Sequence, residues 1–139
     1  MEHVADVRVL YADTDAAGVA YYANYFRWFE TGRAELMRQK GTAYRDLTEA
    51  GMLLPVVEAS IRYRSPARYD DVIKVYAEVR EMRGARITFG YRLTRSDGKL
   101  LAEGATLHAF TDDRGKVVRA PANLTMNTRL VDKSAEEGR

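Results

Sequence analysis

The residues best able to do chemistry lie in one short segment, residues 13–25 of the 139-residue chain. Within it, Asp15 is followed by the small residues 16–18 and then by the predicted start of a helix near residue 21. A helix N-terminus carries unpaired backbone N–H groups and a partial positive charge, which can hold an oxyanion or polarise a carbonyl group. An ionised aspartate ahead of such donors can act as a nucleophile or as a general base toward water. The segment therefore combines a reactive carboxylate with groups that stabilise a developing negative charge.

Each part of this segment also has a purely structural explanation. Aspartate before a helix is a favoured N-cap that contributes about 1 kcal/mol, so Asp13, Thr14 or Asp15 could serve only to cap the helix. The aromatic residues that follow are core or interface residues more often than parts of a substrate pocket. The residues alone therefore leave both explanations open.

Other common catalytic groups are missing. The chain has no cysteine, which excludes disulfides and thiolate metal sites. Its two histidines, His3 and His108, are far apart in sequence, and His108 fits a strand face better than a metal site. The sequence contains no HExxH, GxxxxGKS/T, GxGxxG or GxSxG motif. We therefore expect neither a metal nor a cofactor.

Two kinds of periodicity predict the elements around this segment. Residues 4–12 alternate as a strand, and over residues 21–40 the apolar side chains recur at helical spacing. Gly32 lies on the apolar stripe of this helix, which favours close approach to another backbone. A short helix is expected over residues 42–50, and beyond residue 53 the chain alternates as a series of antiparallel strands. One long helix followed by hairpin strands predicts an α+β fold in which the sheet curls around the helix.

The size of the chain also bounds its organisation. With 139 residues, 46% of them hydrophobic, the chain fits one domain and leaves little room for a second. The outer face of the predicted sheet would stay uncovered, and apolar strips on such faces often form association surfaces. We therefore expect a homo-oligomer. The outer-face residues that indicate association are Tyr76, Thr88, Leu101 and Leu107.

Charge is distributed unevenly along the chain, although the formal net charge is only +2. Residues 1–59 carry 6 basic and 9 acidic side chains, whereas residues 60–99 carry 10 and 5. Eight of those ten cations are arginines, whose guanidinium suits phosphate, while the net charge is too small to indicate nucleic-acid binding. The longest uncharged stretch, residues 16–26, is far shorter than the ~20 apolar residues that span a membrane. With no signal-peptide pattern at the N-terminus, a cytoplasmic protein without membrane insertion is expected.

The segment at residues 13–25, read as D-T-D-x-x-G-V-x-Y-Y-x-N-Y, resembles the hotdog-fold acyl-CoA thioesterases. Phe29-Glu30 and Arg33 on the following helix add to the resemblance, and so does Ser65-Pro-Ala-Arg-Tyr-Asp-Asp71, which is similar to the family's linker between strands. The similarity covers roughly residues 5–120. The most similar branches are the 4-hydroxybenzoyl-CoA thioesterases and the Tol-Pal-associated acyl-CoA thioesterases.

The resemblance implies roles for individual residues. Asp15 matches the family's catalytic carboxylate, Gly18 matches the glycine that shapes the turn, and Tyr22 matches the residue whose backbone N–H polarises the thioester carbonyl. The Tol-Pal-associated branch commonly has histidine at the position of Tyr22, whereas the 4-hydroxybenzoyl branch has an aromatic residue there. The resemblance further implies acyl-group contacts by Tyr21 and Tyr25 and coenzyme A phosphate contacts by Arg83 and Arg86.

The family's fold is a helix wrapped by an antiparallel sheet, paired into dimers or dimers of dimers with shared active sites. On this basis residues 1–131 form a single hotdog domain, and residues 132–139 form a flexible polar tail. The resemblance implies an acyl-CoA thioesterase, with coenzyme A as part of the substrate. The acyl group, aromatic or short aliphatic, and the role of Asp15 as nucleophile or general base stay open.

Two other functions fit the same fold. A non-catalytic module could bind an acyl-CoA or an acyl carrier in the same pocket. A hotdog dehydratase would require a histidine beside a carboxylate, but neither His3 nor His108 lies at the predicted helix junction.

Overall fold

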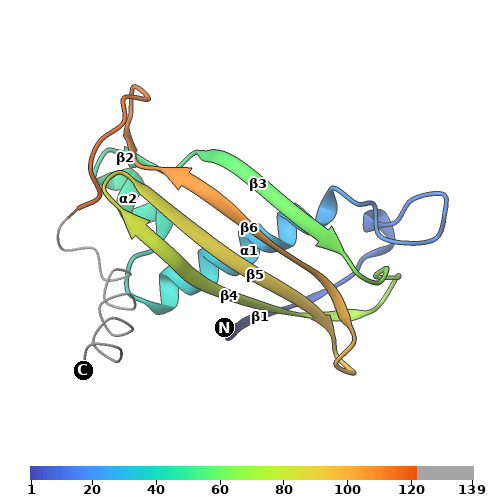
Figure 1. The fold of residues 1–139 in the computed structure, drawn as a ribbon. Coiled ribbons are helices and arrows are strands. Elements are labelled where there is room, and N and C mark those ends of the chain that lie inside the picture. Colours follow the sequence, from blue (N-terminus) through green and yellow to red (C-terminus); the bar gives the residue numbers. More distant parts are fainter. Residues whose placement is uncertain (122–139) are drawn as a thin grey trace.

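A computed structural model describes residues 1–121, so the predicted tail at residues 132–139 and the end of the expected domain lie outside the described residues. These described residues form one long and one short helix, a short 3-10 turn at Tyr11–Asp13, and seven strands. Their arrangement is drawn in Figure 1. The elements are β1 (Glu2–Arg8), α1 (Asn24–Gln39), α2 (Tyr44–Glu49), β2 (Met52–Leu53), β3 (Val56–Tyr63), β4 (Val72–Arg83), β5 (Arg86–Arg95), β6 (Leu100–Ala109) and β7 (Thr111–Asp112).

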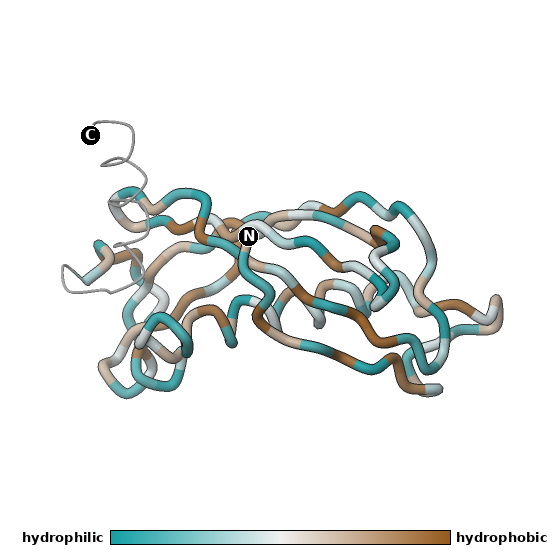
Figure 2. Tube along the Cα trace, turned by 90° about the horizontal axis from the view of Figure 1, so that it is seen from below, coloured by the Kyte–Doolittle hydropathy of each residue, from teal (hydrophilic) through white to brown (hydrophobic). Residues whose placement is uncertain are grey.

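Five strands form one antiparallel sheet in the order β1-β4-β5-β6-β3, and β2 pairs with β7 separately. The sheet curves along one side of α1, as Figure 1 shows. Figure 2 shows hydrophobic and hydrophilic residues alternating along the strands. Alternate residues of β4 are buried, so the sheet has one apolar face. The predicted α+β arrangement of a sheet around one helix is confirmed.

The core lies between α1 and β4, β5 and β6. Phe29 of α1 stacks on Tyr91 of β5 with ring centroids 4.4 Å apart. A Cβ atom at Gly32 would lie only 2.8 Å from Cγ1 of Val75 on β4. Because no side chain larger than glycine fits there without movement, the expected close approach of this helix to the sheet is confirmed.

Element boundaries differ from the predictions at two places near residues 13–25. The first strand ends at Arg8 rather than at residue 12, because the chain turns into the 3-10 helix, where the Asp13 carboxylate accepts the Leu10 N–H at 2.8 Å. The long helix begins at Asn24 rather than near residue 21, since the Tyr21 N–H is bonded to the Asp13 carbonyl at 2.8 Å.

One expected outer-face residue is not on the surface. Leu101 is fully buried, so its assignment to an exposed strip is wrong. The pairing of β5 with β6 shifts register beside Leu101. In addition, the Leu101 carbonyl accepts the Arg64 N–H at 2.8 Å. The other three residues of that face are half-buried.

Strand β3 is the exposed edge of the sheet. Seven of its eight residues are exposed, although its apolar residues alternate as those of a half-buried strand should. Val57 and Tyr63 keep 50% and 44% of their surface exposed, because α1 packs on β1 and β4 rather than on β3. An exposed apolar edge strand is a ready template for pairing with another chain. Within residues 1–121, neither helix is long and apolar enough to cross a bilayer.

Candidate active site

Residues 14–20 form a tight loop beside the start of α1. Thr14 and Ala20 pair as an antiparallel bridge at its base, and the Asp15 N–H donates to the Val19 carbonyl at 2.9 Å. The Gly18 N–H donates back to the Asp15 carbonyl at 2.9 Å, and Gly18 has a φ of +82°. Because L-residues rarely adopt that conformation, the glycine shapes the turn as expected.

Asp15 presents its carboxylate to solvent from this loop. One carboxylate oxygen, Oδ1, accepts the Ala17 N–H at 2.8 Å, and the other has no partner within residues 1–121. The N-cap of α1 is Ala23, which makes no side-chain capping bond. The alternative in which Asp13, Thr14 or Asp15 is present only to cap this helix is therefore excluded.

The Tyr22 N–H is available for a ligand. The carbonyl of the same peptide, that of Tyr21, accepts the Asn24 N–H at 2.9 Å. In the preceding peptide, the Tyr21 N–H donates to the Asp13 carbonyl at 2.8 Å. Within the described residues, the Tyr22 N–H itself has no acceptor. It is thus a fixed, unpaired donor of the kind that stabilises negative charge on a carbonyl oxygen.

A hollow of about 320 Å³ adjoins Tyr22 at the point where β3 ends. The Tyr63 hydroxyl donates to the Tyr22 carbonyl at 2.8 Å and so ties β3 to the start of α1. Tyr25 lines the hollow but is almost completely buried, and its hydroxyl accepts the Ala67 N–H at 3.1 Å. Burial raises the pKa of both Tyr25 and Tyr63, so both phenols stay protonated at neutral pH. The hollow is lined by Val19, Ala20, Tyr22, Tyr25, Tyr63, Arg64, Ser65 and Pro66.

Tyr21 lies beside the hollow without lining it. Its ring is tilted against that of Tyr22, with centroids 4.9 Å apart, and 45% of its surface is exposed. The neighbouring Tyr22 phenol is the main cause that raises the pKa of Tyr21. The structure therefore brings Asp15, Gly18, Tyr21, Tyr22 and Tyr25 to one end of the molecule.

Arg83 and Arg86 lie at the other end. Arg8, after which the chain enters the loop of Asp15, pairs with Val72 at the start of β4, whereas Arg83 ends that 12-residue strand. At ~3.3 Å per residue the two ends are roughly 36 Å apart. Arg83 pairs with Glu81 at 2.9 Å, and both arginines are exposed. Contact of these arginines with a ligand at Tyr22 stays a prediction, and it requires a second copy of the chain.

Sequence reasoning missed three residues of this end. Tyr63 and Arg64 line the hollow, and the side chain of Asp13 joins the loop to α1. Tyr63 and Arg64 directly precede the linker at residues 65–71. Because this linker bonds to Ala20 and Tyr25 through Ala67, the end of β3 lies beside the start of α1. The sequence feature that could have indicated Asp13 is its position as a second aspartate, two residues before Asp15.

A second cavity, of about 250 Å³, lies along the later part of α1, where Glu30, Arg33, Tyr44 and Leu54 contribute to its lining. Beneath it runs a buried chain of hydrogen bonds. The Tyr91 hydroxyl bonds Thr106 Oγ1 at 2.6 Å, Thr106 Oγ1 bonds His108 Nε2 at 2.7 Å, and His108 Nδ1 bonds the Leu54 carbonyl at 3.0 Å. Because a carbonyl only accepts, Nδ1 carries the proton in this arrangement. Burial lowers the pKa of His108 to about 4, so the ring is neutral at neutral pH.

The buried histidine makes stability depend on pH. An unfolded chain takes up a proton on His108 near pH 6.5, whereas the folded chain does so only near pH 4. Stability from this group is therefore complete above pH 6.5 and falls as the pH drops toward 4, by an amount on the order of 2–3 kcal/mol. Chemical denaturation between pH 7 and 4 should show this fall, and it should be smaller in His108→Gln.

The sequence that forms this site and the sheet matches a known protein family. Residues 9–129 match the sequence profile of the Thioesterase-like superfamily. The chain belongs to this hotdog family. The expected hotdog fold is thus confirmed, and the match includes the loop of Asp15 and the whole five-stranded sheet except β1.

Relatives in the thioesterase-like family agree with this membership. The chain is 40% identical over 112 residues to a protein of Haemophilus influenzae named acyl-CoA thioesterase YbgC, covering 80% of this chain and 81% of that one. It is 33% identical over 107 residues to the putative acyl-CoA thioesterase YneP of Bacillus subtilis, covering 77% and 78%. A crystal structure of the hypothetical protein TT1821 from Thermus thermophilus superimposes with a TM-score of 0.86 at 31% identity, covering 93% of this chain and 98% of that one.

Proposed function

We propose that this chain is an acyl-CoA thioesterase that hydrolyses a thioester to a free carboxylic acid and coenzyme A. The observation that carries the proposal is the unpaired Tyr22 N–H at the edge of a hollow, next to a loop that presents the Asp15 carboxylate. Relatives named as acyl-CoA thioesterases support the choice of substrate class.

The chemistry proceeds from these two groups. The thioester carbonyl oxygen accepts the Tyr22 N–H, which polarises the carbonyl and stabilises the oxyanion of the tetrahedral intermediate. Asp15 either attacks the carbonyl carbon, giving an acyl-aspartate that water hydrolyses, or takes a proton from a water molecule that attacks directly. In both routes the C–S bond breaks, and coenzyme A leaves as the thiolate. Gly18 acts through the turn that holds Asp15.

A second copy of the chain completes the site in this proposal. Two β3 edges can pair antiparallel, and a register centred on Ser60 places Arg62 opposite Glu58 of the partner subunit on the outer face. The same register sets Ile61 against the partner's Ala59 on the inner face. A two-fold axis through β3 exchanges the two ends of the sheet. Arg83 and Arg86 of the partner subunit then lie on the side of Tyr22, where they can bind the coenzyme A phosphates.

Turnover on a substrate panel tests the function. Thiol release from aromatic and aliphatic acyl-CoAs, followed with a thiol reagent, should be catalytic for at least one member. The acyl group that gives the largest kcat/KM identifies the substrate, since Tyr21, Tyr22 and Tyr25 suit either an aromatic or a short aliphatic group. Binding of acyl-CoAs without thiol release from any of them would instead establish a non-catalytic binding module.

Solvent labelling separates the two routes. In a single turnover in ¹⁸O-labelled water, an acyl-Asp15 intermediate can be hydrolysed at the aspartyl carbonyl, which places label in the protein. General-base catalysis places the label in the product acid alone.

A further inference from the structure

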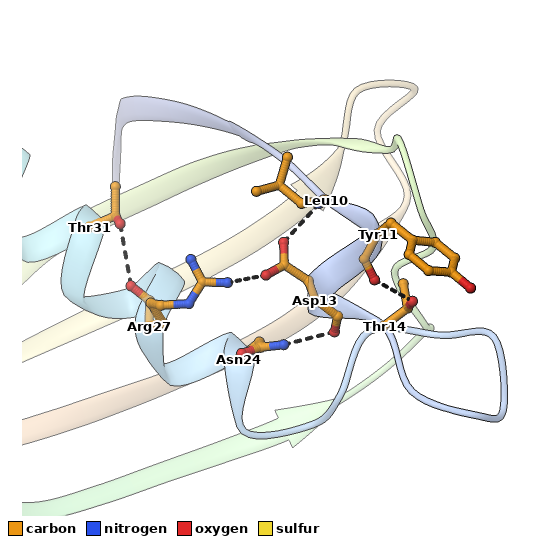
Figure 3. Close-up of polar contacts among 7 residues, drawn as sticks. All are labelled: Leu10, Tyr11, Asp13, Thr14, Asn24, Arg27 and Thr31. Carbon is orange, nitrogen blue, oxygen red and sulfur yellow. Dashed lines mark hydrogen bonds and ion pairs between the residues drawn. The ribbon is translucent and has the colours of Figure 1, made fainter.

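Asp13 is a buried carboxylate beside the proposed site. Among residues 1–121 it is the only acidic residue that is buried, with 7% of its surface exposed. A buried carboxylate is costly unless it is paired and hydrogen-bonded. Both of its oxygens have partners, since Oδ2 accepts the Leu10 N–H at 2.8 Å and Oδ1 forms an ion pair with the Arg27 guanidinium on α1 (Figure 3).

The backbone of Asp13 makes two more bonds to the start of α1. Its carbonyl accepts the Asn24 side-chain amide at 2.8 Å, as Figure 3 shows, and also the Tyr21 N–H at 2.8 Å. Asp13 is therefore bonded to Leu10 at the N-cap of its own 3-10 turn, to Tyr21 before α1, and to Asn24 and Arg27 of α1.

Asn24 connects Asp13 to the Tyr22 donor. Its side chain holds the Asp13 carbonyl, while its backbone N–H holds the Tyr21 carbonyl at 2.9 Å. The Tyr21 carbonyl and the Tyr22 N–H belong to the same planar peptide group. Asn24 thus holds the peptide that carries the Tyr22 N–H, and Asp13 holds the preceding peptide through the Tyr21 N–H. The direction of the Tyr22 N–H is set by these two adjacent peptides.

Arg27 fixes the carboxylate from the helix side. Its guanidinium lies 5.8 Å from the ring centroid of the buried Trp28, and its carbonyl accepts the Thr31 hydroxyl at 3.3 Å. The Arg27 side chain is 52% exposed, so its charge stays partly hydrated while it neutralises Asp13. No bond of this unit goes to the Asp15 carboxylate.

We propose that Asp13, Asn24 and Arg27 form a positioning unit, which fixes the Tyr22 N–H relative to the loop that carries Asp15. This inference rests on the proposed thioesterase function. Catalysis depends on such alignment because a displacement of about 1 Å can cost about 10²-fold in rate. A unit of this kind governs kcat rather than substrate binding, because it acts on the geometry of the transition state.

The test uses Asn24, whose side chain makes the bond to the Asp13 carbonyl. Asn24→Ala removes that bond and favours the helix, so the fold should persist. We expect kcat to fall about 10- to 100-fold, with KM within about 3-fold of wild type and an unchanged thermal unfolding midpoint. Asn24→Asp, which sets a carboxylate against the Asp13 carbonyl, should lower kcat at least as far. Arg38→Gln, which removes another ion pair from α1, is the control and should keep the wild-type kcat.

Arg27 supplies a rescue experiment. Arg27→Gln leaves the Asp13 carboxylate without its cation, and kcat should fall, whereas Arg27→Lys should recover at least half of the loss on a logarithmic scale. Wild-type kcat in Asn24→Ala, or losses of kcat only in proportion to lost folded protein, would overturn the positioning role. A wild-type chain that hydrolyses no acyl-CoA would overturn the proposed function, and this inference with it, so the two failures are distinguishable.

Discussion

Asp15→Asn should lower kcat by about 10²- to 10⁴-fold while the protein stays folded. The amide keeps the size of the side chain, and its oxygen can still accept the Ala17 N–H, so the loop keeps its shape. It lacks the negative charge that attacks the carbonyl carbon or takes a proton from water. The loss should therefore fall on kcat, with little effect on KM or on the thermal unfolding midpoint.

A matched substitution controls for the loss of a surface charge. Asp6 is an exposed aspartate on β1, at the edge of the sheet farthest from β3. Asp6→Asn should keep wild-type kcat within about 2-fold. If Asp15→Asn were as active as Asp6→Asn, neither the nucleophilic nor the general-base role of Asp15 could stand.

Arg62→Glu should weaken self-association by about 100-fold in the dimer dissociation constant, because it sets like charges opposite each other twice across the two-fold axis. Thioester hydrolysis should fall in parallel at low micromolar protein, since the separated chains lack the arginines of the partner subunit. Sedimentation equilibrium measured together with kcat/KM tests both parts. Lys74→Glu, on the outer face but on β4 rather than at the β3 edge, should leave the dimer intact.

A charge-exchange double variant tests the proposed β3 register more specifically. Glu58→Arg combined with Arg62→Glu restores both cross-strand ion pairs with their charges exchanged. The double variant should recover dimerisation and activity to within about 10-fold of wild type. A wild-type chain that remains monomeric, or a double variant as weak as Arg62→Glu alone, would contradict the proposed β3 pairing.

Local periodicity predicted the main helix and strands because their apolar side chains are buried at regular spacing. The stripe that includes Gly32 predicted the long helix. Alternation predicted β4 and β5, because each of these strands is paired on both edges and buries one face. Boundaries near the site could not be found in this way. The strand before Asp13 ends early because the Asp13 carboxylate accepts the Leu10 N–H. The helix α1 begins late because Tyr21 and Asn24, which lie 8 and 11 positions after Asp13, bond its carbonyl.

The site itself was only partly predictable. The turn chemistry of Gly18 and the carboxylate of Asp15 can be read from residue types, since they depend on local backbone conformation. Whether an aspartate caps the helix depends on where the helix begins. The start of α1 at Asn24 depends in turn on the bonds that Tyr21 and Asn24 make to the Asp13 carbonyl. Placing Arg83 and Arg86 near the site requires the second copy, and one chain holds them at the far end of β4.

The proposed function of this chain is to break the thioester bond of an acyl-CoA at Asp15 and Tyr22. The most direct measurement mixes excess protein with one acyl-CoA chosen from the panel and quantifies free acid and free coenzyme A over time. Wild type should release both in equal amounts, whereas Asp15→Asn should do so at least about 10²-fold more slowly. Failure of the wild type to release coenzyme A from any member of the panel, or equal rates for the two proteins, would contradict the claim.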